Sequence, residues 1–380
     1  TGLYKTLDEN GKLVMMGSEE ERQAFVNYAV EVAKRYPQIK RYEIWNEPNA
    51  NNFWPEAPNI ENYKKLVRAV STELKKINPE IEIVIGVTSN SSVNTPTDTG
   101  NYWCINWKEF ISSLMDDDFQ KYFDAVSIHT YYTNKTRADQ KSDIADVVDV
   151  VRKGGGFKNI YITETGGYSG PAWYNKTEEQ KGQEMVRQFV IGDENQIDGT
   201  WLYELVNGGT DQLNSEHNYG VITFEKSDFR PLDGYYAVKD YLSRVDNAVY
   251  IGKVALNENI TGNIYAADDS AFMIAWSNSD EVFDYSFENK VSQYDMYGKH
   301  VKDSNKISFD AKPSYIYGLN EEYIKSIATD FIAESIMSLS STYNNGKFVN
   351  VATRMKQART ADEVYEIITL LASLASEEIN

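Results

Sequence analysis

The chain has 380 residues, which is too long for one small domain and long enough for a barrel-sized core with at least one appended domain. Its 57 acidic and 38 basic residues give a formal net charge of −19, so phosphate backbones and anionic membrane surfaces are poor partners. No run of about 18 apolar residues occurs, and we expect neither a nucleic acid nor a membrane partner. The single cysteine, Cys104, and three scattered histidines predict no metal and no cofactor.

Amphipathic helices alternate with short apolar strands between residues 19 and 245. The first helix opens on a capping box of Ser18 and Glu21, and later helices show apolar residues at helical spacing. The expected strands are 42–45, 81–87, 125–129, 159–163 and 199–203, and a closing helix is expected near 235–242. This alternation is typical of a parallel sheet covered by helices.

The strands recur about every 35 to 45 residues, the repeat of an α/β barrel of the (β/α)8 TIM-barrel type. Five of the eight βα units are present, and we assign them to strands 4 to 8. Open edges at the first and last strand would leave unpaired backbone groups, which natural proteins avoid. We therefore expect roughly 120 further residues upstream, or a second chain, to complete the barrel. The alternative is a genuine five-stranded open sheet.

The pattern changes after residue 247. Short strands with alternating aromatic residues follow up to residue 319, and helical periodicity resumes at 320. We predict three domains: a partial barrel at 1–247, an antiparallel β-sandwich at 248–319 and a helical C-terminal segment at 320–380.

Two glutamates each follow a strand-like run. The first, Glu47, lies in Tyr42-Glu43-Ile44-Trp45-Asn46-Glu47-Pro48-Asn49, and the second, Glu164, lies in Ile162-Thr163-Glu164-Thr165-Gly166. A parallel barrel presents its chemistry at the carboxyl ends of its strands. Glycosidic bond cleavage needs two carboxyl groups, one to protonate the leaving oxygen and one on the other side of the anomeric carbon. The pair therefore predicts a glycoside-cleaving site. On the first strand, Glu43 faces the same side as Glu47, and we expect it to form an ion pair with Arg41.

These motifs resemble those of the clan A glycoside hydrolases. Trp45-Asn46-Glu47-Pro48-Asn49 looks like the acid/base strand of the clan, and Ser127-Ile128-His129-Thr130-Tyr131 looks like its sixth strand. The longer segment from Tyr42, with Phe53-Trp54 after it, is most similar to family 39, which includes β-xylosidases and exopolysaccharide hydrolases. The resemblance covers about residues 19–319 and lacks the first three barrel strands, where the family keeps further sugar-binding groups.

The resemblance implies a role for each matching residue. Glu47 would be the general acid/base and Glu164 the nucleophile of a retaining reaction. Asn46 would hydrogen-bond the 2-hydroxyl of the sugar, and Tyr131 would donate to Glu164 and stabilise its charged form. His129 either contacts sugar or only holds a neighbouring loop, Asn46 could instead cap the following turn, and Trp201 is a sugar platform or a packing residue.

The leading hypothesis is thus a retaining hydrolase of a β-linked oligo- or polysaccharide, with carbohydrate as its partner. The alternative is a non-catalytic carbohydrate-binding or scaffolding protein derived from such a barrel, or a fragment inactive without its remaining strands. We expect a bacterial-type protein that is extracellular or at the cell surface.

Overall fold

A computed structural model describes residues 6–7, 13–14, 16, 18–54, 58–90, 95–96, 102–131, 137–155, 158–171, 175–224, 228–267, 270–342, 346–358 and 361–379. The chain divides into two compact units. One comprises Thr1–Thr165 with Asn195–Leu202, and the other comprises Gly166–Glu194 with Tyr203–Asn380. No helix in the described ranges is both long and apolar enough to cross a bilayer.

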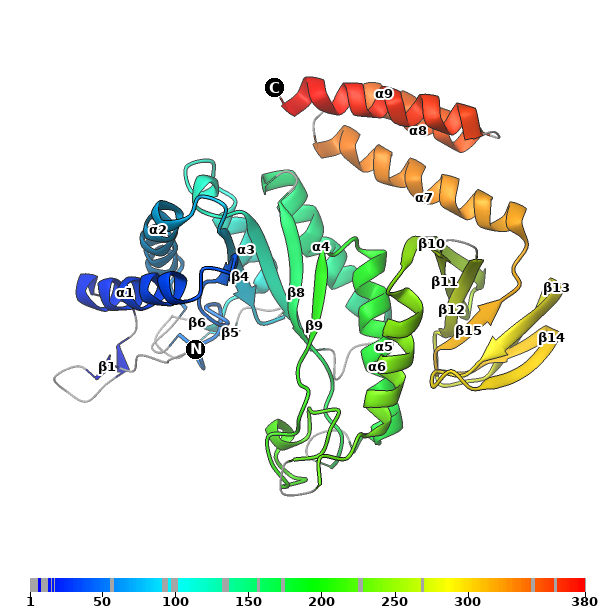
Figure 1. Cartoon of the computed structure of the whole chain (residues 1–380), viewed down its shortest axis with the longest axis horizontal. Helices are drawn as coiled ribbons and strands as arrows, with labels where there is room; N and C mark the ends of the chain where they lie inside the picture. The colour runs from blue at the N-terminus through cyan, green and yellow to red at the C-terminus, as the bar shows by residue number, and fades with distance from the viewer. Residues whose placement is uncertain are drawn as a thin grey trace. The chain divides into compact units, whose positions relative to one another are not determined.

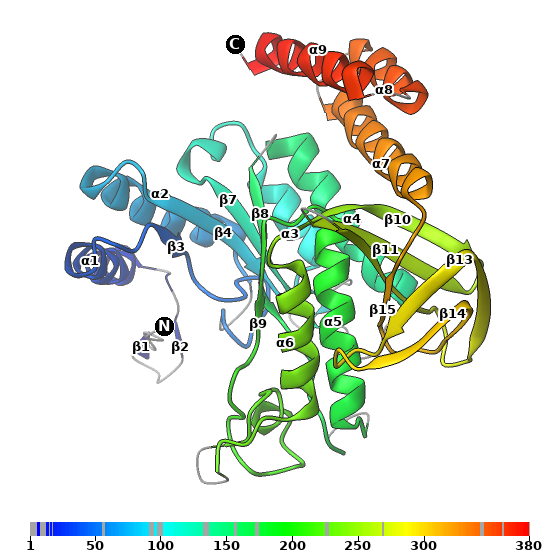
Figure 2. The ribbon, with the colours of Figure 1, turned by 45° about the vertical axis from the view of Figure 1, so that its right-hand side comes forward.

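A five-stranded parallel sheet forms the centre of the first unit. Its strands are β3 (Arg41–Glu43), β4 (Glu82–Thr88), β7 (Ala125–Thr130), β8 (Asn159–Thr165) and β9 (Gly199–Leu202). They lie side by side in chain order, as Figure 2 shows. Each predicted strand is found to within about two residues. The predicted fold class, an α/β barrel type with five βα strands, is confirmed.

Helices cover the sheet: α1 (Glu19–Arg35), α2 (Ile60–Ile77), α3 (Trp107–Leu114) and α4 (Arg137–Gly155). Both halves of the Ser18–Glu21 capping box are formed at the start of α1. Helix α2 buries a continuous apolar face, and each such side chain stabilises the fold by about 1.5–3 kcal/mol. That face comprises Tyr63, Leu66, Val67, Val70 and Leu74. Shorter elements of this unit are β1 (Thr6–Leu7), β2 (Leu13–Val14), β5 (Thr95–Pro96), β6 (Tyr102–Cys104) and a 3-10 turn at Gln120–Tyr122.

The central strands β4, β7 and β8 are buried on both faces, as expected when helices cover a parallel sheet. Ile83, Val126 and Ile160 alternate with Val84, Ala125 and Tyr161, which form a small core on the inner face. Arg41 lies at the start of β3 and pairs with Glu82, not with Glu43, which is exposed. The expected Arg41–Glu43 pair is therefore wrong, because Glu82 begins the neighbouring strand directly beside Arg41.

The second unit begins with helices α5 (Glu178–Glu194) and α6 (Asp233–Val245), which pack against each other, and a 3-10 turn at Ser215–His217. A six-stranded antiparallel sheet follows. It contains β10 (Ala248–Asn257), β11 (Ile260–Ala267), β12 (Ser270–Ser277), β13 (Phe283–Tyr294), β14 (His300–Phe309) and β15 (Ser314–Tyr317). The strand order is β10-β11-β12-β15-β13-β14. Residues from both end strands, such as Ile251 of β10 and Phe309 of β14, pack in one core, so the sheet curls around it.

The second unit ends with three helices, α7 (Glu321–Thr342), α8 (Lys347–Gln357) and α9 (Ala361–Ile379). Figure 1 shows α8 and α9 beside α7. Ile324 and Ile327 of α7 pack against the core of the sheet, whereas its Ile336 belongs to the separate core of the three helices. The expected antiparallel β region and C-terminal helices are both present. The predicted domain limits at residues 247 and 319 remain predictions.

Candidate active site

The segment that carries Glu47 leaves the end of β3 in an unusual conformation. Trp45 and Glu47 have positive φ angles of 76° and 41°, a left-handed region that non-glycine residues rarely adopt. The N–H groups of Ile44 and Glu47 donate to the carbonyls of Val84 and Val87 at 3.0 and 2.9 Å. Strand β4 therefore holds this segment beyond the last paired residue of β3.

Two buried side chains, which the sequence did not single out, fix this segment. Tyr63 donates its hydroxyl to the carbonyl of Ile44 at 3.0 Å and accepts from the N–H of Gly86 at 3.1 Å. Asn49 donates to the carbonyls of Ser89 and Ile105, both at 3.0 Å, and accepts from the N–H of Ser89 at 2.9 Å. In the sequence, Tyr63 shares the apolar face of α2 and cannot be told from a core residue.

Glu164 reaches the same region from the end of β8. The register pairs Ile128 with Ile162 but His129 with Glu164, so Thr163 is an extra residue in β8. This bulge turns Glu164 towards the face that His129 occupies. The hydroxyl of Tyr131 donates to Glu164 Oε2 at 2.7 Å, the contact that the resemblance implied.

His129 lies between the two carboxylates and is fully buried. Its Nδ1 is 2.9 Å from Glu47 Oε1 and 3.4 Å from Glu164 Oε2. In the tautomer that carries a proton on Nδ1, this nitrogen donates towards the carboxylate oxygens. The other ring nitrogen, Nε2, has no hydrogen-bond partner in the described structure. The sequence left two roles open for His129, contact with the sugar or support of a loop. The geometry adds a third role, because His129 lies between the two carboxylates.

The two carboxylates come close together. One oxygen of Glu47, one of Glu164 and a ring nitrogen of His129 all lie within 4.8 Å of one another. Retaining glycosidases place their two carboxyl groups about 5–5.5 Å apart, and inverting enzymes about 6.5–9.5 Å apart. The oxygens of the two glutamates thus lie closer to the retaining spacing than to the inverting one.

The electrostatics of the site raise two pKa values. Burial raises the pKa of Glu164; His129 and the hydrogen bond from Tyr131 oppose this rise, and the charges of Glu47 and Glu43 add to it. For His129, burial lowers the pKa, but the hydrogen bond to Glu47 and the charges of Glu164, Glu47 and Glu43 together outweigh burial and raise it. Tyr131 thus favours the charged form of Glu164, as expected, although burial is the larger influence.

Among the described residues, neither Asn46 nor Trp201 forms a hydrogen bond or an ion pair with Glu47 or Glu164. Asn46 lines an apolar cavity of about 230 Å³ beside α1 and the end of β3, together with Phe25 and Trp45. Trp201 is the third of the four residues of β9; its ring packs edge-on against Tyr161 at 5.7 Å, and it is 43% exposed. The guanidinium of Arg41 lies 5.7 Å from its ring. The roles of Asn46 and Trp201 in sugar binding stay predictions.

No family model and no curated protein matches the sequence. Solved structures do match. A family 39 glycoside hydrolase from the gut symbiont Bacteroides cellulosilyticus superposes with a TM-score of 0.66 at 18% identity, over 82% of this chain and 64% of that one. The chain therefore spans less than two thirds of the length of that structure.

Two further structures match with a TM-score of 0.55. One is a glucosidase from Croceicoccus marinus at 10% identity, over 78% of this chain and 74% of that one. The other is a conserved exported protein from Bacteroides fragilis at 11% identity, over 83% and 72%. The chain has the fold of clan A glycoside hydrolases, similar to that of family 39.

Proposed function

We propose that this chain carries the catalytic pair of a retaining glycoside hydrolase that acts on a β-linked oligo- or polysaccharide. The observation that carries the proposal is the approach of Glu47 and Glu164, which come from the ends of two different strands and have oxygens within 4.8 Å. The resemblance of both motifs and the fold of the glycosidases that superpose on the chain support it.

The reaction proceeds in two displacements. Glu164 attacks the anomeric carbon, the glycosidic C–O bond breaks, and Glu47 gives its proton to the leaving oxygen. The product is a glycosyl ester of Glu164. Glu47, now a carboxylate, takes a proton from water, the water oxygen bonds to the anomeric carbon, and the Glu164 carboxylate leaves.

The neighbouring side chains prepare both steps. Tyr131 donates to Glu164 and so stabilises the carboxylate that must attack and later leave. His129 donates through Nδ1 towards both carboxylates and restrains their separation. When the ester forms, Glu164 loses its charge, and His129 then interacts mainly with Glu47, the group that must accept a proton from water.

The same three groups are also the cluster in the described structure whose spacing would suit a metal ion. A bound cation would engage the Glu164 oxygen that must attack carbon, so the proposed reaction uses no metal and no cofactor. Activity that is unchanged after EDTA treatment is the expected result. Loss of activity that Ca²⁺, Mn²⁺ or Zn²⁺ restores would contradict it.

We also propose that a preceding segment or a second chain completes the barrel. In the described structure, β3 pairs only with β4, and β9 only with β8. The inner-face side chains of Arg41 and Trp201 are 44% and 43% exposed, although inward residues of a closed barrel are packed. Near the edge of β3, the Tyr42 hydroxyl is buried without a hydrogen-bond partner beside the apolar cavity.

We also propose a location outside the cell, because one of the similar structures is named as an exported protein.

Hydrolysis of activated aryl β-glycosides tests the catalytic proposal. We expect Glu164→Gln to abolish turnover, and Glu47→Gln to lower kcat by about 10²–10⁴-fold, with a smaller loss for better leaving groups. Glu80→Gln, an exposed carboxylate beside Lys40, is the matched control and should retain full activity. Azide should rescue Glu164→Ala and give a glycosyl azide of inverted configuration. A wild-type chain as inert as both variants would favour a non-catalytic carbohydrate-binding or scaffolding protein.

A further inference from the structure

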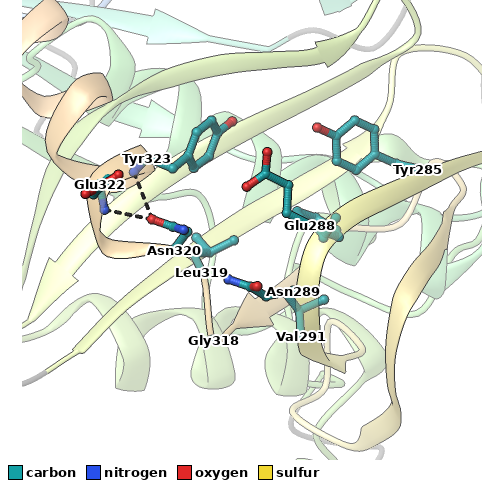
Figure 3. A pocket seen from close by; sticks show the side chains of 10 residues that line it. Tyr285, Glu288, Asn289, Val291, Gly318, Leu319, Asn320, Glu322 and Tyr323 are labelled. Atoms are coloured by element: carbon teal, nitrogen blue, oxygen red, sulfur yellow. Dashed lines mark hydrogen bonds between the residues drawn. The ribbon is translucent and has the colours of Figure 1, made fainter.

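The β domain, which comprises strands β10 to β15 of the second unit, contains a cavity of about 370 Å³ between β13 and the start of α7. Figure 3 shows the residues around it, with Glu288 between Tyr285 and Tyr323. This volume lies in the range of small-molecule sites. The lining residues are Tyr285, Phe287, Glu288, Asn289, Val291, Gly318, Leu319, Asn320, Glu322 and Tyr323.

The cavity exists because β13 leaves its ladder. Ser286 pairs with Lys306 and Val291 pairs with Ser304, so residues 287–290 face a single residue of β14. A bulge of this kind re-aims side chains, and bulges are enriched at functional sites. Here it carries Phe287, Glu288 and Asn289 to the cavity.

The other wall is the connection from β15 to α7. Gly318 has a φ of +85°, which lets the chain turn close to Val291 of β13. The Oδ1 of Asn320 then accepts from the N–H groups of Glu322 and Tyr323 at 2.8 and 3.4 Å and caps the helix, as the dashed lines of Figure 3 show. One wall is thus set by the bulge in β13, and the other by the turn at Gly318 and the Asn320 cap of α7.

The lining combines rings with hydroxyl, amide and carboxylate groups. Tyr285 and Phe287 pack edge to face, with centroids 4.8 Å apart. Burial, with a further contribution from Tyr285, raises the pKa of Tyr323 to about 12, so its hydroxyl stays protonated and can donate. Glu288, Asn289 and Glu322 are exposed and offer further hydrogen-bonding atoms. None of the lining residues is basic, which disfavours phosphate, sulfate and uronate ligands.

We infer that this cavity is a second, non-catalytic carbohydrate site that takes a neutral sugar residue of a β-linked glycan. Apolar ring faces suit the C–H face of a sugar, and the surrounding oxygens and amides suit its hydroxyl groups. Rings and carboxylates would also attract an organic cation. However, Tyr285 and Phe287 meet edge to face and do not surround a point, and both carboxylates are exposed to water.

The choice of ligand rests on the proposed function. A glycan held at the β domain stays at high effective concentration near the enzyme, because the second contact is intramolecular. Loss of the site should therefore lower activity on a polymer and leave activity on a small aryl glycoside unchanged.

Calorimetry with the inactive Glu164→Gln chain tests the site. The probes are the β-1,4-linked hexamers of glucose and of xylose, which are neutral, and the hexamer of glucosamine, which is cationic. Adding Tyr285→Ala or Glu288→Ala should weaken binding of a neutral hexamer at the cavity by about tenfold. Adding Tyr297→Ala should change nothing, because this exposed tyrosine lies in the turn between β13 and β14 and does not line the cavity.

Folding must be separated from binding, because Tyr285 packs partly against the core of the sheet. Tyr285→Phe keeps the aromatic ring, and Glu288→Ala changes an exposed side chain. Each of these two variants should therefore melt within about 2 °C of the parent. Unchanged binding in the Glu288→Ala and Tyr285→Ala chains overturns the inference. So does failure of both neutral hexamers to bind, and so does loss of glucosamine hexamer binding alone.

The two proposals fail in different ways. If the neutral hexamers bind through the cavity while the wild-type chain hydrolyses no aryl glycoside, the second site stands and the proposed catalysis is wrong. If aryl glycosides are hydrolysed but the cavity variants bind like the Tyr297→Ala control, only the second site is wrong.

Discussion

Three side chains from three strand ends meet around the proposed reacting carbon, and each depends on the charge of the others. Glu47 and Glu164 are both hydrogen-bonded or close to His129, which is almost fully enclosed. Like charges a few Å apart in a buried site cannot all ionise without a compensating proton. That proton is shared within the group, so the protonation of the site is a property of the group and not of one residue.

Tyr131→Phe tests the support of the nucleophile at the residue scale. The hydrogen bond from Tyr131 lowers the pKa of Glu164, so its loss should raise that pKa further. Because the attack needs the carboxylate, the acidic limb of the kcat/KM profile should move to higher pH, and activity at low pH should fall by about tenfold. The exposed Tyr236→Phe is the control. An unshifted acidic limb would contradict the role of Tyr131.

The pH dependence of stability gives a second test at this scale. His129 and Glu164 both have folded pKa values above their ordinary values of 6.5 and 4.5. Protonation of each therefore stabilises the folded chain. The contribution of Glu164 is complete below pH 4.5 and that of His129 below pH 6.5, and each is lost as pH rises through its folded pKa. The free energy of unfolding should fall from pH 5 to 8 more steeply in wild type than in His129→Asn, as urea titrations would show. Equal slopes would contradict this assignment.

Particular residues show what the sequence could predict here. The positions of Glu47 and Glu164 at strand ends can be predicted, because apolar runs and their spacing indicate a parallel sheet. The bulge in β8 cannot be predicted, since its extra residue, Thr163, looks like any other strand residue. Trp201 was expected near the pair, but its neighbours Tyr161 and Arg41 lie at the amino ends of their strands. Alternation fixes the face of a strand and not the depth at which a side chain finds its partner.

At the scale of elements, the hydrogen bonds of Asn49 fix the conformation of the loop after β3 more than local backbone propensity does. Asn49 is fully buried and binds Ser89 and Ile105, which belong to loops that follow β4 and precede α3. Its amide satisfies three backbone groups at once. One asparagine thus joins loops that are distant in sequence, which no local pattern could have shown.

Asn49→Ala should therefore be costly. Truncation leaves buried carbonyls unpaired and is expected to destabilise the chain by about 2–4 kcal/mol and to lower kcat, since Glu47 lies two residues away. Urea unfolding and aryl glycoside hydrolysis would measure both. Asn59→Ala at the start of α2 is the matched control, with an expected cost of about 1 kcal/mol and no change in kcat. Equal effects of the two variants would show that Asn49 is only another cap.

At the scale of the whole molecule, the sheet of the first unit has two unpaired edges, at β3 and β9. The regular βα spacing of the sequence predicts these five strands. The family 39 structure that superposes on the chain is longer than the chain. The proposed catalysis therefore depends on whether further strands cover the edges at β3 and β9. Edge strands with apolar neighbours attract further strands, so the uncovered sheet should not remain alone at high concentration.

We expect the rate of aryl glycoside hydrolysis per chain to rise with protein concentration, because a second copy of the chain is the partner available to cover β3 and β9 in the purified protein. Trp201, which is 43% exposed, should become less accessible to acrylamide over the same concentration range, and Trp201→Phe would identify its share of the quenching. A high rate that does not depend on concentration would show that five strands suffice for catalysis. Negligible rates at every concentration, with Trp201 still accessible, would show that a second copy of this chain does not complete the sheet and would favour a non-catalytic carbohydrate-binding or scaffolding protein.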